Sequence, residues 1–204
     1  MRTMIRRRST GKRGMPKPAF LIVCGGEKTE PNYFNNFPIK SVWVDVAIKA
    51  EDPMSLVKYA IELKKDYKTN GMKFEQVWCV FDKDDFPLGE FNNAVKLAQE
   101  KKLKVAYSNE SFELWYLLHF DYMHSAIGRS AYIEKLKQKP GMGGIYRKND
   151  NNMYQKLLDR QSTAIQHAEK LILLYSPVNP GKDSPSTTVH CLVQELNKFI
   201  TNGA

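Results

Sequence analysis

Cysteine is scarce in this sequence and forms no metal-binding pattern. The three cysteines, Cys24, Cys79 and Cys191, lack the paired spacing of a zinc site. Two of them fall inside predicted strands, which is typical of buried, reduced thiols. We therefore expect a protein of the reducing cytoplasm and no structural zinc.

Long apolar runs are also missing. No run approaches the roughly 18 residues that a membrane span needs, and no apolar stretch of the kind found in a secretion signal follows the basic start of the chain. We expect no association with a membrane. The 204 residues are 42% hydrophobic and 26% charged, which is typical of a globular protein with one sizeable core.

Acidic residues are absent from the first 18 positions. These positions hold seven Lys and Arg residues, so they carry +7 of the net charge of +9 and leave +2 for the rest. Such a segment lacks the apolar content to fold alone, and we expect a disordered basic arm over residues 1–18. The arm is either a solubilising tail or a site of sequence-independent attraction to nucleic-acid phosphates, with Arg6, Arg7 and Arg8 as candidate contacts.

Apolar runs and helical periodicity alternate through the first half of the chain. This order predicts an α/β fold with a four-stranded, mostly parallel sheet between helices, over residues 19–120. No strand is predicted after residue 108, so residues 121–204 are expected to form a helical region packed on that core. The predicted strands cover residues 20–24, 42–48, 76–81 and 104–107.

Two aspartates follow the predicted strand at residues 76–81. Asp82 and Asp84 are two positions apart, which places both side chains on the same side of an extended chain. Two carboxylates that close repel each other unless a cation lies between them. The alternative is an ordinary acidic turn before Pro87, since aspartate is common in turns.

Two glutamates follow the first predicted strand in the same way. Glu27 comes directly after Gly25 and Gly26, which allow a tight turn, and Glu30 follows three residues later. The loop lacks the closing Gly-Lys-Ser/Thr of a P-loop. Because ligands bind beyond the carboxyl ends of parallel strands, we expect these acids to join Asp82 and Asp84 around a hard cation such as Mg²⁺. The alternative for Glu30 is a favourable charge at a helix N-terminus.

A further carboxylate lies in the apolar segment at residues 111–120. Glu113 stands between Phe112 and Leu114 in a helix that is apolar almost all round. An unpaired buried carboxylate is costly, so Glu113 needs a hydrogen-bond donor, a cation or a functional role. It is a candidate metal ligand, direct or through a neighbouring group.

Four segments in this order resemble the RloB family of bacterial defence-associated proteins. They read FLIVCGGEKTEPNYF, VWCVFDKDDF, YSNESFELWYLLHF and SPSTTVHCLVQEL, and they lie between residues 19 and 196. The resemblance implies a Toprim-like fold, with four parallel strands between helices and carboxylates that bind Mg²⁺ for phosphodiester cleavage. It also implies a role beside ATPases in restriction or abortive-infection loci, and therefore a possible ATPase partner encoded nearby.

One position departs from the family pattern. The pattern has Cys-Glu-Gly-Glu-Lys-Thr-Glu after the first strand, whereas Gly25 stands at the first of these glutamates here. Loss of that glutamate would weaken activity if it were the base or the main ligand, and Glu27 or Glu30 is the available substitute. The pair Asp82 and Asp84 is intact, as are Asn109 and Glu113.

From these features we expect a Mg²⁺- or Mn²⁺-dependent nuclease that acts in phage defence on DNA or RNA. The expected catalytic set is Glu27, Glu30, Asp82 and Asp84, with Glu27 as general base and with Glu30, Asp82, Asp84 and Glu113 as metal ligands. Expected contacts to nucleic acid, besides the arm, are Lys28, Lys83, Arg147 and Lys148, the last two in a glycine-rich loop. The alternative is a non-catalytic subunit that binds nucleic acid or an ATPase and carries a degenerate acid site.

Overall fold

The strands predicted for the first half of the chain form and pair into one sheet. In the computed structural model, which describes residues 20–39, 42–46 and 52–200, the strand order is β2-β1-β3-β4-β5. All pairings are parallel except that of β4 with β5. The predicted basic arm and the end of the predicted second strand lie outside the described residues. The strands are β1 Phe20–Cys24, β2 Val42–Val46, β3 Gln76–Asp82, β4 Lys104–Asn109 and β5 Ser186–Thr187.

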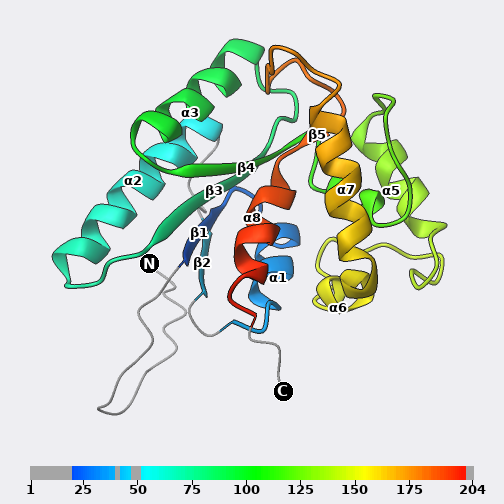
Figure 1. Ribbon diagram of the computed structural model, residues 1–204, viewed down its shortest axis with the longest axis horizontal. Helices are drawn as coiled ribbons and strands as arrows, with labels where there is room; N and C mark the ends of the chain where they lie inside the picture. Colours follow the sequence, from blue (N-terminus) through cyan, green and yellow to red (C-terminus); the bar gives the residue numbers. More distant parts are fainter. Residues whose placement is uncertain (1–19, 40–41, 47–51, 201–204) are drawn as a thin grey trace.

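Helices cover both faces of this sheet (Figure 1). Helices α2 (Pro53–Thr69) and α3 (Leu88–Glu100) pack on one face, and α1 (Thr29–Asn35) and α8 (Val189–Asn197) pack on the other. Side chains alternate across a strand, so Leu21 and Val23 of β1 face α2 and α3 while Phe20 and Ile22 face the opposite core. Both faces of β1 are buried, which explains its unbroken apolar sequence.

Local signals in the sequence set the ends of the longest helix, α2. The side chain of Asp52 accepts a hydrogen bond from the backbone N–H of Ser55 at 2.8 Å, and Pro53 occupies the first helical position. Gly71, with φ of +77°, follows the last turn and reverses the chain. The Asp-Pro pair thus begins the helix, and the Asn-Gly pair ends it.

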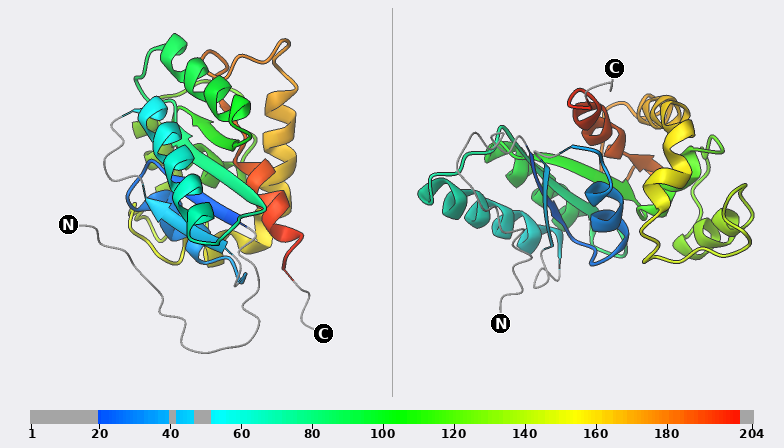
Figure 2. Two further views of the ribbon diagram at one scale, coloured as in Figure 1. Left: turned by 90° about the vertical axis from the view of Figure 1, so that its left-hand side faces the viewer. Right: turned by 90° about the horizontal axis from the view of Figure 1, so that it is seen from below.

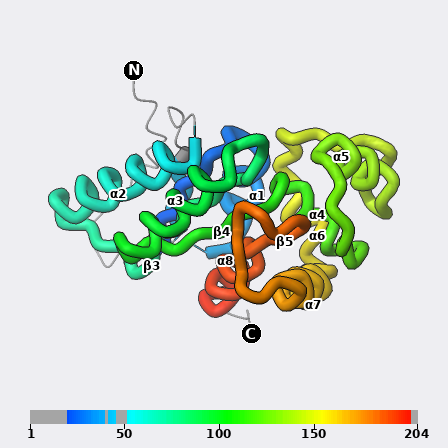
Figure 3. Tube along the Cα trace, turned by 90° about the horizontal axis from the view of Figure 1, so that it is seen from above, coloured from blue at the N-terminus to red at the C-terminus, as the bar shows by residue number. Residues whose placement is uncertain are grey.

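The second half of the chain is mainly helical and lies at one end of the sheet (Figures 2 and 3). It contains α4 (Glu113–Leu118), α5 (Arg129–Lys137), α6 (Met153–Leu157) and α7 (Gln161–Ile172). Every residue of α4 is buried, as its apolar sequence predicts. This region shares one apolar core with α1, α8 and the adjoining sheet face.

The prediction of four strands, with none after residue 108, is wrong. Ser186 and Thr187 form a fifth strand, β5, which pairs antiparallel with the end of β4. Ser186 lies in this strand, and Thr188 precedes α8. A strand of two hydroxyl residues has no hydrophobic pattern by which it could be predicted. Contacts with neighbouring segments, and not its own sequence, hold it in place.

No helix in the described ranges 20–39, 42–46 and 52–200 is long and apolar enough to cross a membrane.

Candidate acidic pocket at the carboxyl end of the sheet

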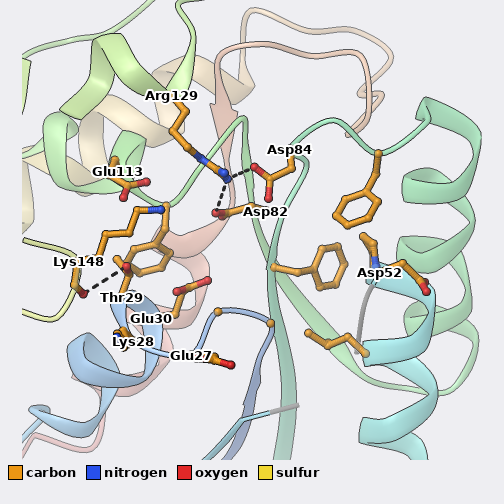
Figure 4. Close-up of a pocket in the computed structure, with 17 residues that line it drawn as sticks. Glu27, Lys28, Thr29, Glu30, Asp52, Asp82, Asp84, Glu113, Arg129 and Lys148 are labelled. Carbon is orange, nitrogen blue, oxygen red and sulfur yellow. Dashed lines mark hydrogen bonds and ion pairs between the residues drawn. The ribbon is translucent and has the colours of Figure 1, made fainter. Parts of the chain in front are cut away.

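The carboxyl ends of β1, β3 and β4 surround a cavity of about 450 Å³ (Figure 4). Parallel register brings these ends together: Cys24 pairs with Val80, and Asp82 pairs with Ser108. Loops that follow the three strands therefore open at one edge of the sheet, where α/β proteins bind ligands. The charged side chains that line the cavity are Glu27, Lys28, Glu30, Asp52, Asp82, Asp84, Glu113, Arg129 and Lys148.

The two aspartates at the end of β3 both pair with the guanidinium of Arg129. Asp82 is the last residue of β3, and Asp84 follows with φ of +44°, a left-handed conformation that is uncommon outside glycine. Arg129 forms an ion pair with each: its Nη2 lies 3.6 Å from Asp82 Oδ2 and is also paired with Asp84 Oδ1. Both aspartates line the cavity, although Asp84 lies in a turn and not in the extended chain on which the prediction from their spacing rested.

Glu30 lies in the first turn of α1, and only 5% of its surface is exposed. Its carboxylate occupies the space over Gly26, where any side chain would collide with both carboxylate oxygens. Gly26 therefore allows the Glu30 side chain to approach the backbone closely, in addition to allowing the turn. The glycine pair thus directs Glu30 into the cavity.

Glu113 is almost fully buried at the start of α4 but has a hydrogen-bond donor. The hydroxyl of Tyr146 donates to its Oε1 at 3.0 Å. Tyr146 belongs to the glycine-rich segment after α5, which also returns to α1: the Thr29 hydroxyl donates to the backbone oxygen of Lys148 at 3.4 Å. These two contacts hold the segment against the cavity, so Lys148 extends its side chain toward Glu30 and Glu113 (Figure 4).

The carboxyl groups in the cavity make one another harder to ionise. The pKa of Glu30 is raised to about 7: burial is the main cause and the Glu113 carboxyl adds to it, while backbone N–H groups and the Lys148 ammonium oppose the shift. Burial also raises the pKa of Asp82 well above its ordinary value, with further increases from Glu30 and Glu113. Added positive charge would relieve this repulsion.

The remaining predicted site residues divide into two groups. Glu27 and Lys28 are exposed at the rim of the cavity, and Figure 4 shows Glu27 farther from Asp82 than Glu30 is. Lys83 does not line the cavity; its ammonium donates to the backbone oxygen of Asp84 at 3.2 Å. Arg147 is exposed and also lies outside the lining, whereas its neighbour Lys148 belongs to it.

Arg6, Arg7 and Arg8 lie outside the described residues.

The carboxylates that line the cavity are of the type that a hard divalent cation prefers, but they are not arranged around a common metal position. No three His, Cys, Asp or Glu side chains of the described part of the chain form a group that could hold a metal ion. Arg129 instead supplies positive charge to Asp82 and Asp84. Carboxylate oxygens are the ligands that Mg²⁺ prefers, and the mutual repulsion of Glu30, Asp82 and Glu113 is what such an ion would offset.

The sequence did not indicate two residues that act on the acids of the cavity: Arg129, which lines it, and Tyr146, which donates to Glu113. Arg129 lies at the start of α5, and Tyr146 lies in a loop that reads only as mobile and glycine-rich. The buried carboxylate of Glu113 was the one available signal, because it required a donor or cation from somewhere in the fold. The sequence did not indicate which segment would supply it.

Gly25, where the family pattern has glutamate, lies in the wall of the same cavity. Its N–H donates to the backbone oxygen of Val80 at 2.8 Å, which continues the ladder between β1 and β3. A Cβ at this position would lie 3.0 Å from Leu56 Cδ1 and 3.6 Å from Phe81 Cβ, and these residues also line the cavity. A glutamate here would add another carboxylate beside α2, provided that the end of Leu56 moved slightly.

A comparison with protein families gives one match. The family model described as RloB-like protein matches residues 20–196, which is most of the chain and includes all three strand ends of the cavity. No curated protein and no solved structure matches the chain.

Proposed function

The chain belongs to the RloB-like family, and from this premise and its acidic pocket we propose a metal-dependent nuclease that acts in bacterial phage defence. The parallel strands β2, β1, β3 and β4, with helices on both faces, support comparison with Toprim proteins. In this comparison β5 is an addition at the edge of a four-stranded Toprim-like sheet.

One observation carries the proposal: three carboxylates from distant segments, two of them buried and one partly buried, line one cavity. Glu30 follows β1, Asp82 ends β3 and Glu113 follows β4, and the pKa values of Glu30 and Asp82 are raised by burial and by the neighbouring acids. A fold gains no stability from such repulsion, so it favours a functional explanation. Perturbed carboxylates that face a cleft are typical of sites that bind cations or transfer protons.

In this proposal Glu30, Asp82 and Asp84 would hold Mg²⁺ or Mn²⁺, with Glu113 beside them. The ion, when bound, would supply Lewis-acid stabilisation of charge on a phosphate group. Tyr146 donates a hydrogen bond to the buried carboxylate of Glu113 and thereby holds this side chain in position.

The other charged groups of the cavity have distinct proposed roles. Glu27 is exposed at the rim, where its carboxylate can accept a proton from a water molecule, and it is the candidate general base. Lys148 and Lys28 place ammonium groups at the same cavity and are candidates to bind phosphate oxygens. The exposed Arg147 and the basic first 18 residues would add attraction to the nucleic-acid backbone.

Replacement of Asp82 by alanine tests the proposal. We expect Mn²⁺-dependent cleavage of single- or double-stranded DNA or RNA by the wild-type chain, and a loss in Asp82→Ala larger than the roughly 100-fold that removal of an outer-shell partner costs. Asp85→Ala is the matched control, because Asp85 is exposed in the same turn and does not line this cavity. Cleavage by Asp82→Ala at the wild-type rate would remove Asp82 from the site.

A second function is favoured by Gly25 and by the pairing of Arg129 with both aspartates. A protein with these features could be a non-catalytic subunit that binds nucleic acid or an ATPase and has a degenerate acid site. Titration of the full chain with Mn²⁺ in a calorimeter separates the two. Binding that Asp82→Ala abolishes supports the nuclease, whereas no heat at millimolar metal supports the subunit.

A further inference from the structure

Arg129 lines two cavities. Besides the acidic pocket, a second cavity of about 420 Å³ is lined by Arg129 and Asp84, which the two cavities share. The second cavity has its own acids, Asp85 and Glu110. Arg129 therefore borders two acidic cavities.

The backbone of Arg129 is held by a hydrogen bond, whereas only part of its guanidinium has a partner. The N–H of Arg129 donates to Glu110 Oε2 at 3.1 Å, which anchors the start of α5. At the other end of the side chain, Nη2 serves both Asp82 and Asp84. Nε is buried without a hydrogen-bond partner, so a group with five N–H donors uses few of them here. This arginine is held by charge more than by a complete set of hydrogen bonds.

The position of the guanidinium conflicts with a divalent cation on the same aspartates. Two positive groups about 4 Å apart repel each other strongly in a partly buried site. The Oδ atoms that Arg129 contacts are also oxygens through which Asp82 and Asp84 would bind a metal ion. The guanidinium and a divalent cation therefore weaken each other's binding to Asp82 and Asp84.

We propose that Arg129 is a tethered counter-ion that neutralises Asp82 and Asp84 in the metal-free protein and must be displaced before a divalent cation binds there. Arg129 thereby sets the metal affinity of the site. This inference rests on the proposed function, because it requires Asp82 and Asp84 to be metal ligands. Once displaced, the guanidinium stays near the cavity, because the backbone N–H of Arg129 remains bound to Glu110, and its free donors suit a phosphate group.

Calorimetric titration of the full chain with Mn²⁺, without nucleic acid, tests this inference. We expect Arg129→Gln to bind Mn²⁺ about tenfold more tightly than wild type, which lies within the roughly 5- to 150-fold range of coupled equilibria. Arg129→Lys keeps the charge but replaces the guanidinium, whose Nη2 contacts both carboxylates, with an ammonium group, so its Mn²⁺ affinity should fall between those of wild type and Arg129→Gln. Lys137→Gln is the matched control, because it removes a positive charge from the exposed side of the same helix, where Lys137 pairs with Glu134.

Thermal unfolding with and without Mn²⁺ supplies a second readout. In EDTA, Arg129→Gln should melt below wild type, because it leaves the partly buried Asp82 without its counter-ion. Saturating Mn²⁺ should remove that difference, while a residue with only a packing role would leave it unchanged. Lys137→Gln should match wild type in both conditions.

The outcomes separate this inference from the function beneath it. If wild type binds Mn²⁺ and both Arg129 variants bind it no more tightly, Arg129 is not a competing counter-ion, and the nuclease proposal stands. If neither wild type nor variants bind Mn²⁺, the metal-dependent function fails, and the inference fails with it.

Discussion

Glu30 has a carboxyl group whose titration should be visible in the stability of the whole protein. Its pKa rises from 4.5 to about 7 in the folded protein, chiefly through burial. Between these values the folded state binds more protons than the unfolded state, so the free energy of unfolding falls as pH increases. The stabilising contribution of the protonated form is present below pH 4.5 and is lost as pH rises through about 7.

Replacement of Glu30 by glutamine should remove this pH dependence. In EDTA at pH 8, Glu30→Gln should be more stable than wild type, by up to an amount on the order of 3 kcal/mol for a shift of this size. Near pH 4.5 the two proteins should differ little, since glutamine resembles the protonated acid. Urea unfolding at both pH values measures the difference. Glu27→Gln, at an exposed position, should change stability little at either pH, and a loss of stability in Glu30→Gln at pH 8 would contradict the assignment.

At the scale of elements, β5 connects the helical region to the sheet through hydroxyl groups. The Thr187 hydroxyl donates to the backbone oxygen of Tyr107 at 2.9 Å and lies 3.0 Å from the Ser108 hydroxyl. It also accepts from the N–H of Val189 at 3.2 Å, at the start of α8. One buried side chain thus joins β4, β5 and α8.

We expect Thr187→Val to destabilise the protein by about 2 kcal/mol. Valine keeps the shape but leaves the N–H of Val189 without this acceptor, and a buried unpaired donor costs roughly 1–3 kcal/mol. Chemical unfolding at one pH measures the change. Thr69→Val is the matched control, because its hydroxyl donates to a backbone oxygen at an exposed helix end, and its effect should stay within about 0.5 kcal/mol. Equal effects at the two positions would argue against a structural role for β5.

The elements that could be predicted are those whose own sequence contains the reason for their structure. Strands β1 and β3 are apolar because both their faces are buried, and α2 begins and ends at residues with capping chemistry. Glu27, Glu30, Asp82 and Asp84 could be predicted to lie at one edge, since parallel strands end there, whereas Asp52, which also lines the pocket, was not predicted. Strand β5 and the contacts of Arg129 and Tyr146 depend on how distant segments pack, and no local pattern indicates such packing.

At the scale of the whole molecule, charge is divided unevenly along the chain. The first 18 residues contain seven basic and no acidic side chains, while the remaining residues together carry +2. The pocket itself is rich in carboxylates and has few cations to attract a polyanion. In the proposed nuclease, general attraction to nucleic acid would therefore come mainly from outside the pocket.

Deletion of residues 1–18 should weaken binding to duplex DNA and make it less sensitive to salt. Each phosphate contact contributes about 0.9 to the slope of log K against log salt, so the slope should become shallower by as much as about 6 if all seven side chains contribute. Fluorescence anisotropy at several salt concentrations measures the slope. A full-length variant with the seven residues changed to glutamine controls for chain length and should behave like the deletion. An unchanged slope in both would leave the arm as a solubilising tail.

The division of the pocket along the chain has a practical consequence for protein fragments. The predicted core, residues 19–120, contains all the carboxylates that line the cavity but neither Arg129 nor Lys148, which come from the segments that follow. It also lacks Tyr146, the donor to Glu113. A piece cut at residue 120 would keep every carboxylate of the cavity and only one of its three basic side chains, Lys28, so its acids would be less balanced. Dissection of this protein should therefore proceed by point substitution in the intact chain and not by truncation.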